Sequence, residues 1–211
     1  MGIKTSTILN TAKLRNKEFI DLIPEIYELE KVIENDNHYH NNDSVFDHIM
    51  SVLKGLEEIL KSIKEKVSDY LSQKITNYSR KELLFLTILF HDIGKKETMI
   101  KDSNGFTSCP GHAEKSATKA ENFLSCFDLS EKEKDLVSQI IKYHMLLYLI
   151  VKPENNKINE QFNGSKVKHP NIFLELVLLA MADILGTQLE ENNQWEFNFV
   201  INFYERFLTE Y

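Results

Sequence analysis

The sequence predicts an all-α fold, a bundle of helices joined by loops. Glycine and proline are scarce, with 7 and 4 copies, and most of them lie between segments of helical periodicity. No alternation of polar and apolar residues bounded by turn residues indicates a strand. A chain of 211 residues can bury one sizeable core, so we expect a single domain over residues 1–211.

The composition limits the classes of function. Apolar and charged fractions of 42% and 27% are typical of a globular protein. The net charge of -7 argues against general nucleic-acid binding, but it allows a small phosphorylated substrate in a locally positive pocket. The longest apolar segment, 172–185, contains Glu175 and Asp183, which favours a core helix over a membrane span. Cys109 and Cys126 form no paired framework, which indicates reduced thiols and a cytoplasmic location.

The first half of the chain predicts two amphipathic helices. One covers residues 14–34, where apolar residues recur on one face and Pro24 either kinks or divides the helix. Residues 35–43 form a polar loop. Ser44 then caps a second helix, with Asp47 at the third helical position and His48 in the first turns.

The second half predicts further helices and two loops. The helices cover residues 111–127, residues 131–149 after a capping box of Ser130 and Glu133, a segment begun by Pro170 that carries Asp183, and residues 195–211. Residues 102–110 form one loop. The other, 152–169, is rich in Asn and Lys, and we expect it to be mobile or to act as a lid.

A central segment, LLFLTILFHDIGKKET, combines an apolar helix with chemically active residues. Residues 83–90 are apolar on every side, which predicts a helix in the middle of the fold. His91 and Asp92 follow, and Gly94 is able to turn the backbone. Because a buried carboxylate beside an imidazole is costly without a cationic partner, the pair indicates a metal ion.

Six residues are the best candidates for metal ligands. Each lies near the end of a predicted helix or inside an apolar one, and together they come from five helices: His48, His91, Asp92, His112, His144 and Asp183. Such dispersal is expected of a site built in the core of a helical bundle. Asp183, within AMADILG, has no neighbouring Lys or Arg to pair with. A lone histidine is more often a core residue, and His38, His40 and His169 are interpreted in that way.

Three segments, VFDHIMSVL, HDIGK and MADILG, resemble the HD-domain metal-dependent phosphohydrolase superfamily. The resemblance covers about residues 38–187 and implies an all-helical domain, with the helices 14–34 and 195–211 packed on it. In that family the pattern H…HD…D binds one ion, which here implies His48, His91, Asp92 and Asp183. Members with two ions add two histidines, which implies His112 and His144 here, with Asp92 bridging the ions.

Two shorter stretches extend the resemblance. HYHNNDSVFDH is similar to the approach to the first histidine in HD domains of bacterial tRNA nucleotidyltransferases. GHAEKSA is similar to a GHE-x-x-[SG]-A stretch of such domains, with Ala113 in place of the usual Glu.

The resemblance implies a metal-dependent phosphohydrolase, either a phosphomonoesterase or a phosphodiesterase, acting on a small phosphorylated substrate such as a nucleotide or nucleotide derivative. Two ions sharing Asp92 would convert a bound water into hydroxide, which attacks phosphorus. Histidine and aspartate ligands suit iron, manganese, cobalt, nickel or zinc. Lys95 is placed to reach a phosphate, or else it is a solvated lysine after a helix end. We therefore expect Asp92 and Lys95 to be the catalytic residues.

Two other functions remain open at this point. Some HD-domain proteins use the same six ligands as a di-iron oxygenase. A non-catalytic module that senses a metal or a ligand is the third possibility.

Overall fold

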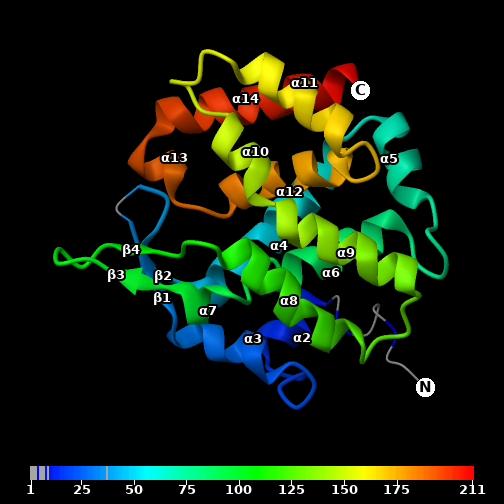
Figure 1. Ribbon diagram of the computed structural model, residues 1–211, viewed down its shortest axis with the longest axis vertical. Helices are drawn as coiled ribbons and strands as arrows, with labels where there is room; N and C mark the ends of the chain where they lie inside the picture. Colours follow the sequence, from blue (N-terminus) through cyan, green and yellow to red (C-terminus); the bar gives the residue numbers. More distant parts are fainter. Residues whose placement is uncertain (1–3, 5–7, 9, 37) are drawn as a thin grey trace.

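The computed structural model describes residues 4, 8, 10–36 and 38–211, and these are mostly helical (Figure 1). The strands in these ranges form two small antiparallel sheets of two strands each. The predicted all-α fold is confirmed, with two hairpins that the sequence did not predict. Among the same residues, no helix is both long and apolar enough to cross a membrane.

The elements of the first half are α2 (Thr11–Arg15), α3 (Pro24–Glu28), the 3-10 helix η1 (Leu29–Lys31), β1 (Ile33–Asn35), β2 (Asn41–Ser44), α4 (Val45–Ser62), α5 (Glu65–Ser72), α6 (Arg80–Phe90) and α7 (Lys95–Thr98). Those of the second half are β3 (Ile100–Lys101), β4 (Thr107–Ser108), α8 (His112–Leu124), α9 (Glu131–Tyr143), α10 (Met145–Ile150), α11 (Ile158–Lys168), α12 (Phe173–Leu185), α13 (Leu189–Asn192) and α14 (Gln194–Glu210).

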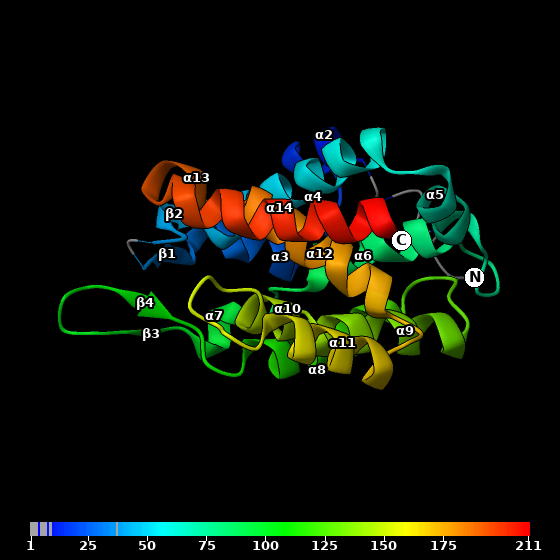
Figure 2. The same cartoon turned by 90° about the horizontal axis from the view of Figure 1, so that it is seen from above.

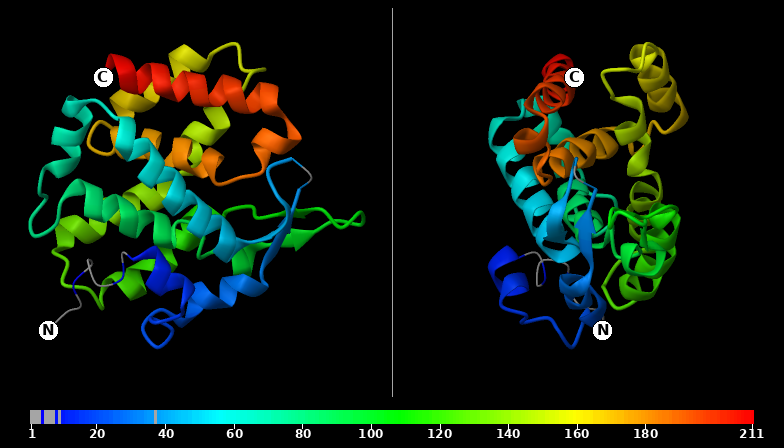
Figure 3. Two further views of the ribbon diagram at one scale, coloured as in Figure 1. Left: turned by 180° about the vertical axis from the view of Figure 1, so that it is seen from behind. Right: turned by 90° about the vertical axis from the view of Figure 1, so that its left-hand side faces the viewer.

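Helices α6 and α12 lie at the centre of the bundle. Helix α12 packs against α4, α6, α9, α10 and α14, and α6 also contacts α4, α5, α8 and α9. Seen from above, α8 to α11 lie on one side and α4 and α14 on the other (Figure 2). The side view in Figure 3 shows the same two layers. In α6, residues 83–90 are buried except for the partly exposed Phe85, which explains why the segment has no polar face.

Helices α4 and α12 cross closely because glycines lie at their contact. A Cβ atom on Gly55 would lie 3.0 Å from a carbonyl oxygen of α12, and one on Gly186 would lie 2.6 Å from Cγ2 of Val52. Larger side chains would therefore force the helices apart. The close approach brings the first turns of α4, with His48, next to the end of α12, with Asp183.

Polar caps fix where several helices begin. The Ser44 hydroxyl accepts a hydrogen bond from the Asp47 backbone N–H, as predicted. Ser130 and Glu133 form the predicted capping box of α9. A second capping box, formed by Ser79 at the start of α6, was not predicted.

The predicted helix over 14–34 is wrong as one element. Helix α2 ends at Arg15, residues 16–23 form turns, and Pro24 starts α3 at its first position, where a missing N–H costs nothing. After η1 the chain becomes extended, and Ile33 to Asn35 pair with the following strand, so the predicted loop 35–43 includes part of a hairpin. The predicted loop 102–110 likewise contains β4, which pairs with β3.

Two predictions in the second half are also corrected. The predicted helix 131–149 ends at Tyr143 and restarts at Met145, because His144 lies at the junction between α9 and α10. The predicted loop 152–169 is largely helix α11, whose Phe162 packs against Phe203 and Phe207 of α14. None of residues 152–169 lines the cavity described below, so this segment is not a lid in this structure.

Candidate metal centre

The structure brings the six predicted ligands together where α4, α6, α8, α9 and α12 meet. Five of them line a cavity of about 480 Å³: His48, Asp92, His112, His144 and Asp183. His91 lies behind them and is fully buried. The expectation that ligands from several helices converge in the core is met by these positions, while their role as ligands stays a prediction.

The four imidazoles are oriented by backbone carbonyl groups. In His91, His112 and His144, Nδ1 lies 2.7 Å from the carbonyl oxygen of the residue three positions earlier. His91 and His144 stand at helix ends, where carbonyl groups lack partners within the helix. Nδ1 of His48 faces the Gly186 carbonyl oxygen at 3.3 Å. With the Nδ1 proton donated to a carbonyl, each ring directs Nε2 into the cluster, as a metal ligand requires.

The two carboxylate oxygens of Asp92 face two different groups of side chains. Oδ2 lies 3.2 Å from Nε2 of His91 and 3.5 Å from Nε2 of His48, and Asp183 completes this first group. Oδ1 lies 3.3 Å from Nε2 of His112 and 3.7 Å from Nε2 of His144. Two sets of three residues have ligand atoms that all lie within 4.8 Å of one another and could hold a metal ion: His48, His91 and Asp183, and Asp92, His112 and His144.

Unpaired buried atoms in this cluster fit a cation. Among the described side chains, Nε2 of His91 and Oδ1 of Asp92 are buried without a hydrogen-bond partner. Nε2 of His112 and Nε2 of His144 approach to 3.1 Å, although both nitrogens carry lone pairs when Nδ1 holds the proton. A divalent ion satisfies such convergent lone pairs, which are costly to bury unpaired.

The pKa values of the cluster reflect its buried charges. Burial by itself raises the pKa of Asp92, but the charges of His91 and Lys95 hold it well below its usual range. Burial likewise opposes ionisation of Asp183, but its hydrogen bond with His48 and the nearby His91 imidazole lower its pKa. For His91 burial is outweighed by the Asp92 and Asp183 carboxylates, which raise its pKa to about 10. Burial and the neighbouring imidazoles lower the pKa of His144 to about 3.

Gly94 in HDIGK lies in a turn between α6 and α7, as predicted, and it also allows a close approach to α8. Its φ of -83° is accessible to any residue. A Cβ atom at this position would lie 2.6 Å from the backbone nitrogen of Ser116 and 2.8 Å from the carbonyl oxygen of His112. Gly94 also donates its backbone N–H to Oγ of Ser116 at 2.9 Å. The glycine therefore holds the segment that follows His91 and Asp92 directly against α8.

Lys95 is buried, so its alternative interpretation as a solvated lysine is wrong. Its Nζ lies 2.9 Å from Oδ2 of Asp92 and 2.8 Å from Oε2 of Glu34, a second buried carboxylate. Burial disfavours the ammonium, but Asp92 and Glu34 outweigh it and raise the pKa of Lys95 above its ordinary value. The lysine thus stays charged, and in this structure it binds two carboxylates.

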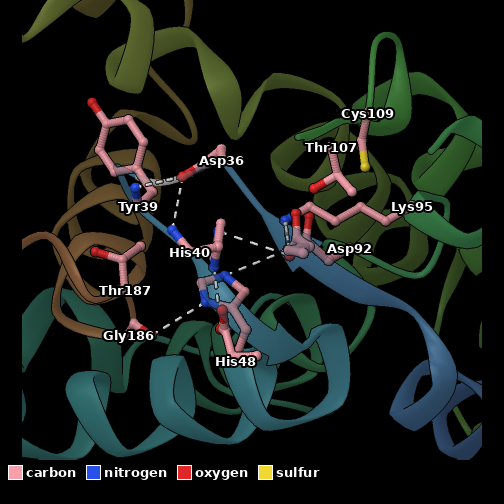
Figure 4. Close-up of polar contacts among 12 residues, drawn as sticks. Asp36, Tyr39, His40, His48, Asp92, Lys95, Thr107, Cys109, Gly186 and Thr187 are labelled. Atoms are coloured by element: carbon pink, nitrogen blue, oxygen red, sulfur yellow. Dashed lines mark hydrogen bonds and ion pairs between the residues drawn. The ribbon is translucent and has the colours of Figure 1, made fainter. Parts of the chain in front are cut away.

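The two hairpins form the outer wall of the cavity (Figure 4). The loop between β1 and β2 is organised by Asp36, whose Oδ1 accepts the backbone N–H groups of His38, Tyr39 and His40. The β1–β2 hairpin is joined to β4 by the Asn35 N–H, which donates to Oγ1 of Thr107 at 2.8 Å. Wall residues that the sequence did not assign to the site include Glu34, Asp36, His38, Tyr39, His40, Thr107, Cys109 and Tyr148.

One signal could have pointed to part of this wall. Lys95 follows the predicted ligand Asp92 by three positions. A lysine buried beside a metal ligand needs a further carboxylate to compensate its charge. The sequence offers many carboxylates and does not say which one. His40 was interpreted as a core histidine; it is buried, and Oδ2 of Asp43 lies 3.1 Å from its Nδ1.

A helical bundle with histidines and aspartates clustered beside a cavity is typical of a domain that can hold metal ions. The chain belongs to the HD domain family, whose model matches residues 45–187. This match confirms the resemblance, and HD domains form a superfamily of metal-dependent phosphohydrolases. The matched residues include all six predicted ligands, whereas the β1–β2 hairpin precedes them.

Curated relatives share the same region at low identity. A bifunctional uridylyltransferase/uridylyl-removing enzyme of Chromobacterium violaceum is 27% identical over 155 residues, which cover 72% of this chain and 17% of the relative. Enzymes with the same name from Neisseria gonorrhoeae and Bordetella avium are 24% and 27% identical over 154 and 157 residues, with the same coverage. The chain therefore spans about a sixth of the length of these relatives.

Proposed function

We propose that the protein hydrolyses a phosphate ester of a nucleotide or nucleotide derivative, using two divalent transition-metal ions held by the six clustered residues. The observation that carries the proposal is the convergence of four Nε2 atoms on the carboxylates of Asp92 and Asp183. Asp92 would bridge the ions because its two oxygens face different ligand groups. Ions in this position supply a nucleophile from water at neutral pH and neutralise charge on the phosphate.

The residues of the chain have separate tasks in this proposal. The backbone carbonyl groups fix the ring orientations of the histidines, so that little reorganisation accompanies binding. Asp183 adds negative charge to the group of His48 and His91 and offsets the charge of a cation there. The cavity gives a phosphate access to the cluster, as catalysis requires and as a buried sensor site does not.

The aromatic part of the wall supports a substrate that carries a base. The rings of Tyr39 and Tyr148 pack with their centroids 5.1 Å apart, and both residues line the cavity. Nζ of Lys152 lies 5.0 Å from the centre of the Tyr148 ring. Aromatic faces of this kind stack on nucleobases. The names of the relatives, which include removal of a uridylyl group, agree with a nucleotide derivative.

Elemental analysis and an activity panel test the proposal. Protein purified without chelators should contain up to two transition-metal ions per chain. It should hydrolyse nucleoside phosphate mono- or diesters when Mn²⁺, Co²⁺, Ni²⁺ or Zn²⁺ is supplied, and Asp92→Ala should abolish this activity. Full activity after complete chelation would contradict the proposal. Iron-dependent uptake of oxygen without ester hydrolysis would favour the di-iron oxygenase instead.

A matched pair of variants tests the aromatic wall. Tyr148→Ala should reduce kcat/KM for nucleoside esters about 10-fold or more and leave esters of small aliphatic alcohols unchanged, because stacking on one base contributes roughly 1–3 kcal/mol. Tyr148→Phe retains the ring and should behave like the wild type. Equal losses on both kinds of ester would contradict base recognition at this wall.

A further inference from the structure

Glu34 is a buried carboxylate that the proposed metal centre does not use as a ligand. Its Oε2 lies 2.8 Å from Nζ of Lys95, and the same Nζ lies 2.9 Å from Oδ2 of Asp92. The exposed fractions of Glu34, Lys95 and Asp92 are 6%, 7% and 1%. One ammonium group is therefore shared by two carboxylates, and all three side chains are largely buried in the wall of the cavity.

The position of Glu34 is fixed from two sides. In β1 it is paired with Asp43 of β2, and the next residue, Asn35, donates its N–H to Thr107 of β4. Lys95, on the other side, is the first residue of α7, directly after the glycine that packs against α8. Neither partner can move far without disrupting backbone contacts. Glu34 precedes residues 45–187, so the matched HD domain does not include it.

The shared ammonium bears on metal binding because it occupies Oδ2 of Asp92. Without an ion, the Lys95 charge compensates Asp92. A divalent ion bound to the same carboxylate repels the ammonium, strongly so in a buried site of low dielectric. Because only 7% of Lys95 is exposed, solvent offsets little of its charge, and an anion on the side away from the ion stabilises the ammonium. Glu34 lies in that position.

We propose that Glu34 is a positioning residue of the metal centre, which retains the Lys95 ammonium when Asp92 exchanges that ion pair for a divalent cation. This inference rests on the proposed role of Asp92 as a metal ligand. It assigns a task in metal loading to a strand that lies outside the matched HD domain. Lys95 then competes with the metal for Asp92, and Glu34 weakens that competition.

Three variants, and a control variant on the surface, test the inference through metal affinity and without reference to activity. In Glu34→Gln, Lys95 retains Asp92 as its only carboxylate, so metal binding should weaken roughly 10- to 100-fold, as for other residues that support a ligand. In Lys95→Met the competitor is gone, and binding should be tighter than in the wild type. The double variant E34Q/K95M should recover at least the wild-type affinity, since neither charge remains.

A surface pair provides the matched control. Lys96, the next residue, forms an ion pair with Glu28 at 2.6 Å, and both side chains are about half exposed. Glu28→Gln removes a carboxylate from a lysine in the same helix and should leave metal affinity unchanged. Affinities are measured for Co²⁺ and Zn²⁺ by competition with a chromophoric chelator. Circular dichroism and thermal unfolding of the apoprotein check that each variant is folded.

The metal affinities of these variants distinguish a positioning role of Glu34 from the alternatives. Wild-type affinity in Glu34→Gln overturns the inference. If the double variant binds as weakly as Glu34→Gln, Glu34 is itself a ligand, which also overturns it. Should Glu34→Gln fail to fold, Lys95→Met decides, because weaker binding than in the wild type contradicts competition. Retention of both ions in Asp92→Ala would instead refute the proposed metal site, so the two failures are distinguishable.

Discussion

The two groups of side chains around Asp92 have the same number of imidazoles but different charge. His48 and His91 share their group with Asp183, whereas His112 and His144 have only the Oδ1 atom of Asp92. The first group can therefore neutralise a cation with a carboxylate of its own. The second depends on the shared aspartate and on neutral rings. We infer that the first group binds its ion more tightly and that the second ion is the exchangeable one.

The largest effect is expected from removing the residue that the two groups share. Asp92→Ala should eliminate binding of both ions, since it removes one oxygen ligand from each group and leaves Lys95 beside the histidines without that carboxylate. Elemental analysis after dialysis against metal-free buffer measures the stoichiometry. Retention of one ion would mean that one group binds its ion without Asp92, which would contradict the assignment of Asp92 as a ligand shared by both groups.

Removing a ligand from one group should affect the ion of that group and leave the other ion bound. His112→Ala should lower the stoichiometry from two ions to one and abolish most of the activity, while the remaining ion keeps its affinity. Asp183→Asn, in the other group, should instead weaken the tighter ion roughly 10-fold or more. Titration with Co²⁺, followed by its absorption spectrum, distinguishes the two sites. Unchanged stoichiometry and activity in His112→Ala would contradict the two-ion assignment.

Proton release should also differ between the groups. Because the pKa of His91 is raised to about 10, both ring nitrogens are protonated at pH 7 in the metal-free protein. The ring must lose one of these protons to bind an ion. Affinity at the first group should therefore rise with pH, by up to about 10-fold per unit below pH 10. His144, with a pKa of about 3, is already neutral at pH 7 and contributes no such release. Calorimetry in buffers of different ionisation enthalpy counts the protons.

The smallest effect is expected from Gly94→Ala, which should perturb the second group more than the first. The added Cβ atom meets the backbone of α8 at Ser116 and His112, so it should destabilise the fold by about 1–3 kcal/mol and displace His112. Gly164→Ala is the control, because no atom lies within 4 Å of its Cβ position and helix α11 should gain about 1 kcal/mol. Thermal unfolding and the affinity of the second ion measure both changes.

The local signals in the sequence predicted the parts of the fold that local physics determines. Ser44 and Ser130 cap helices as their neighbours require, and the apolar stretch before His91 is buried. The six candidate ligands could be named because histidine and aspartate are rare inside apolar helices. In the structure their side chains converge on one cluster beside the cavity.

Other parts depend on contacts that no local pattern contains. Ile33 continues the apolar periodicity of the preceding helix, yet it lies in a strand because β1 pairs with β2. His144 interrupts a periodic segment without any Gly or Pro, and its ring binds the carbonyl oxygen of Ile141. Glu34 became part of the site only through Lys95, 61 positions later in the chain. Such pairs are visible only when distant segments are placed together.

The close crossing of α4 and α12 also has a kinetic consequence. His48 and Asp183 are 135 positions apart, so their encounter requires closure of a loop almost as long as the matched domain. The first ligand group therefore forms only when α4 and α12 have docked. Metal ions added to the unfolded chain would find scattered histidines and no site, so they should stabilise the folded protein by mass action without accelerating its formation.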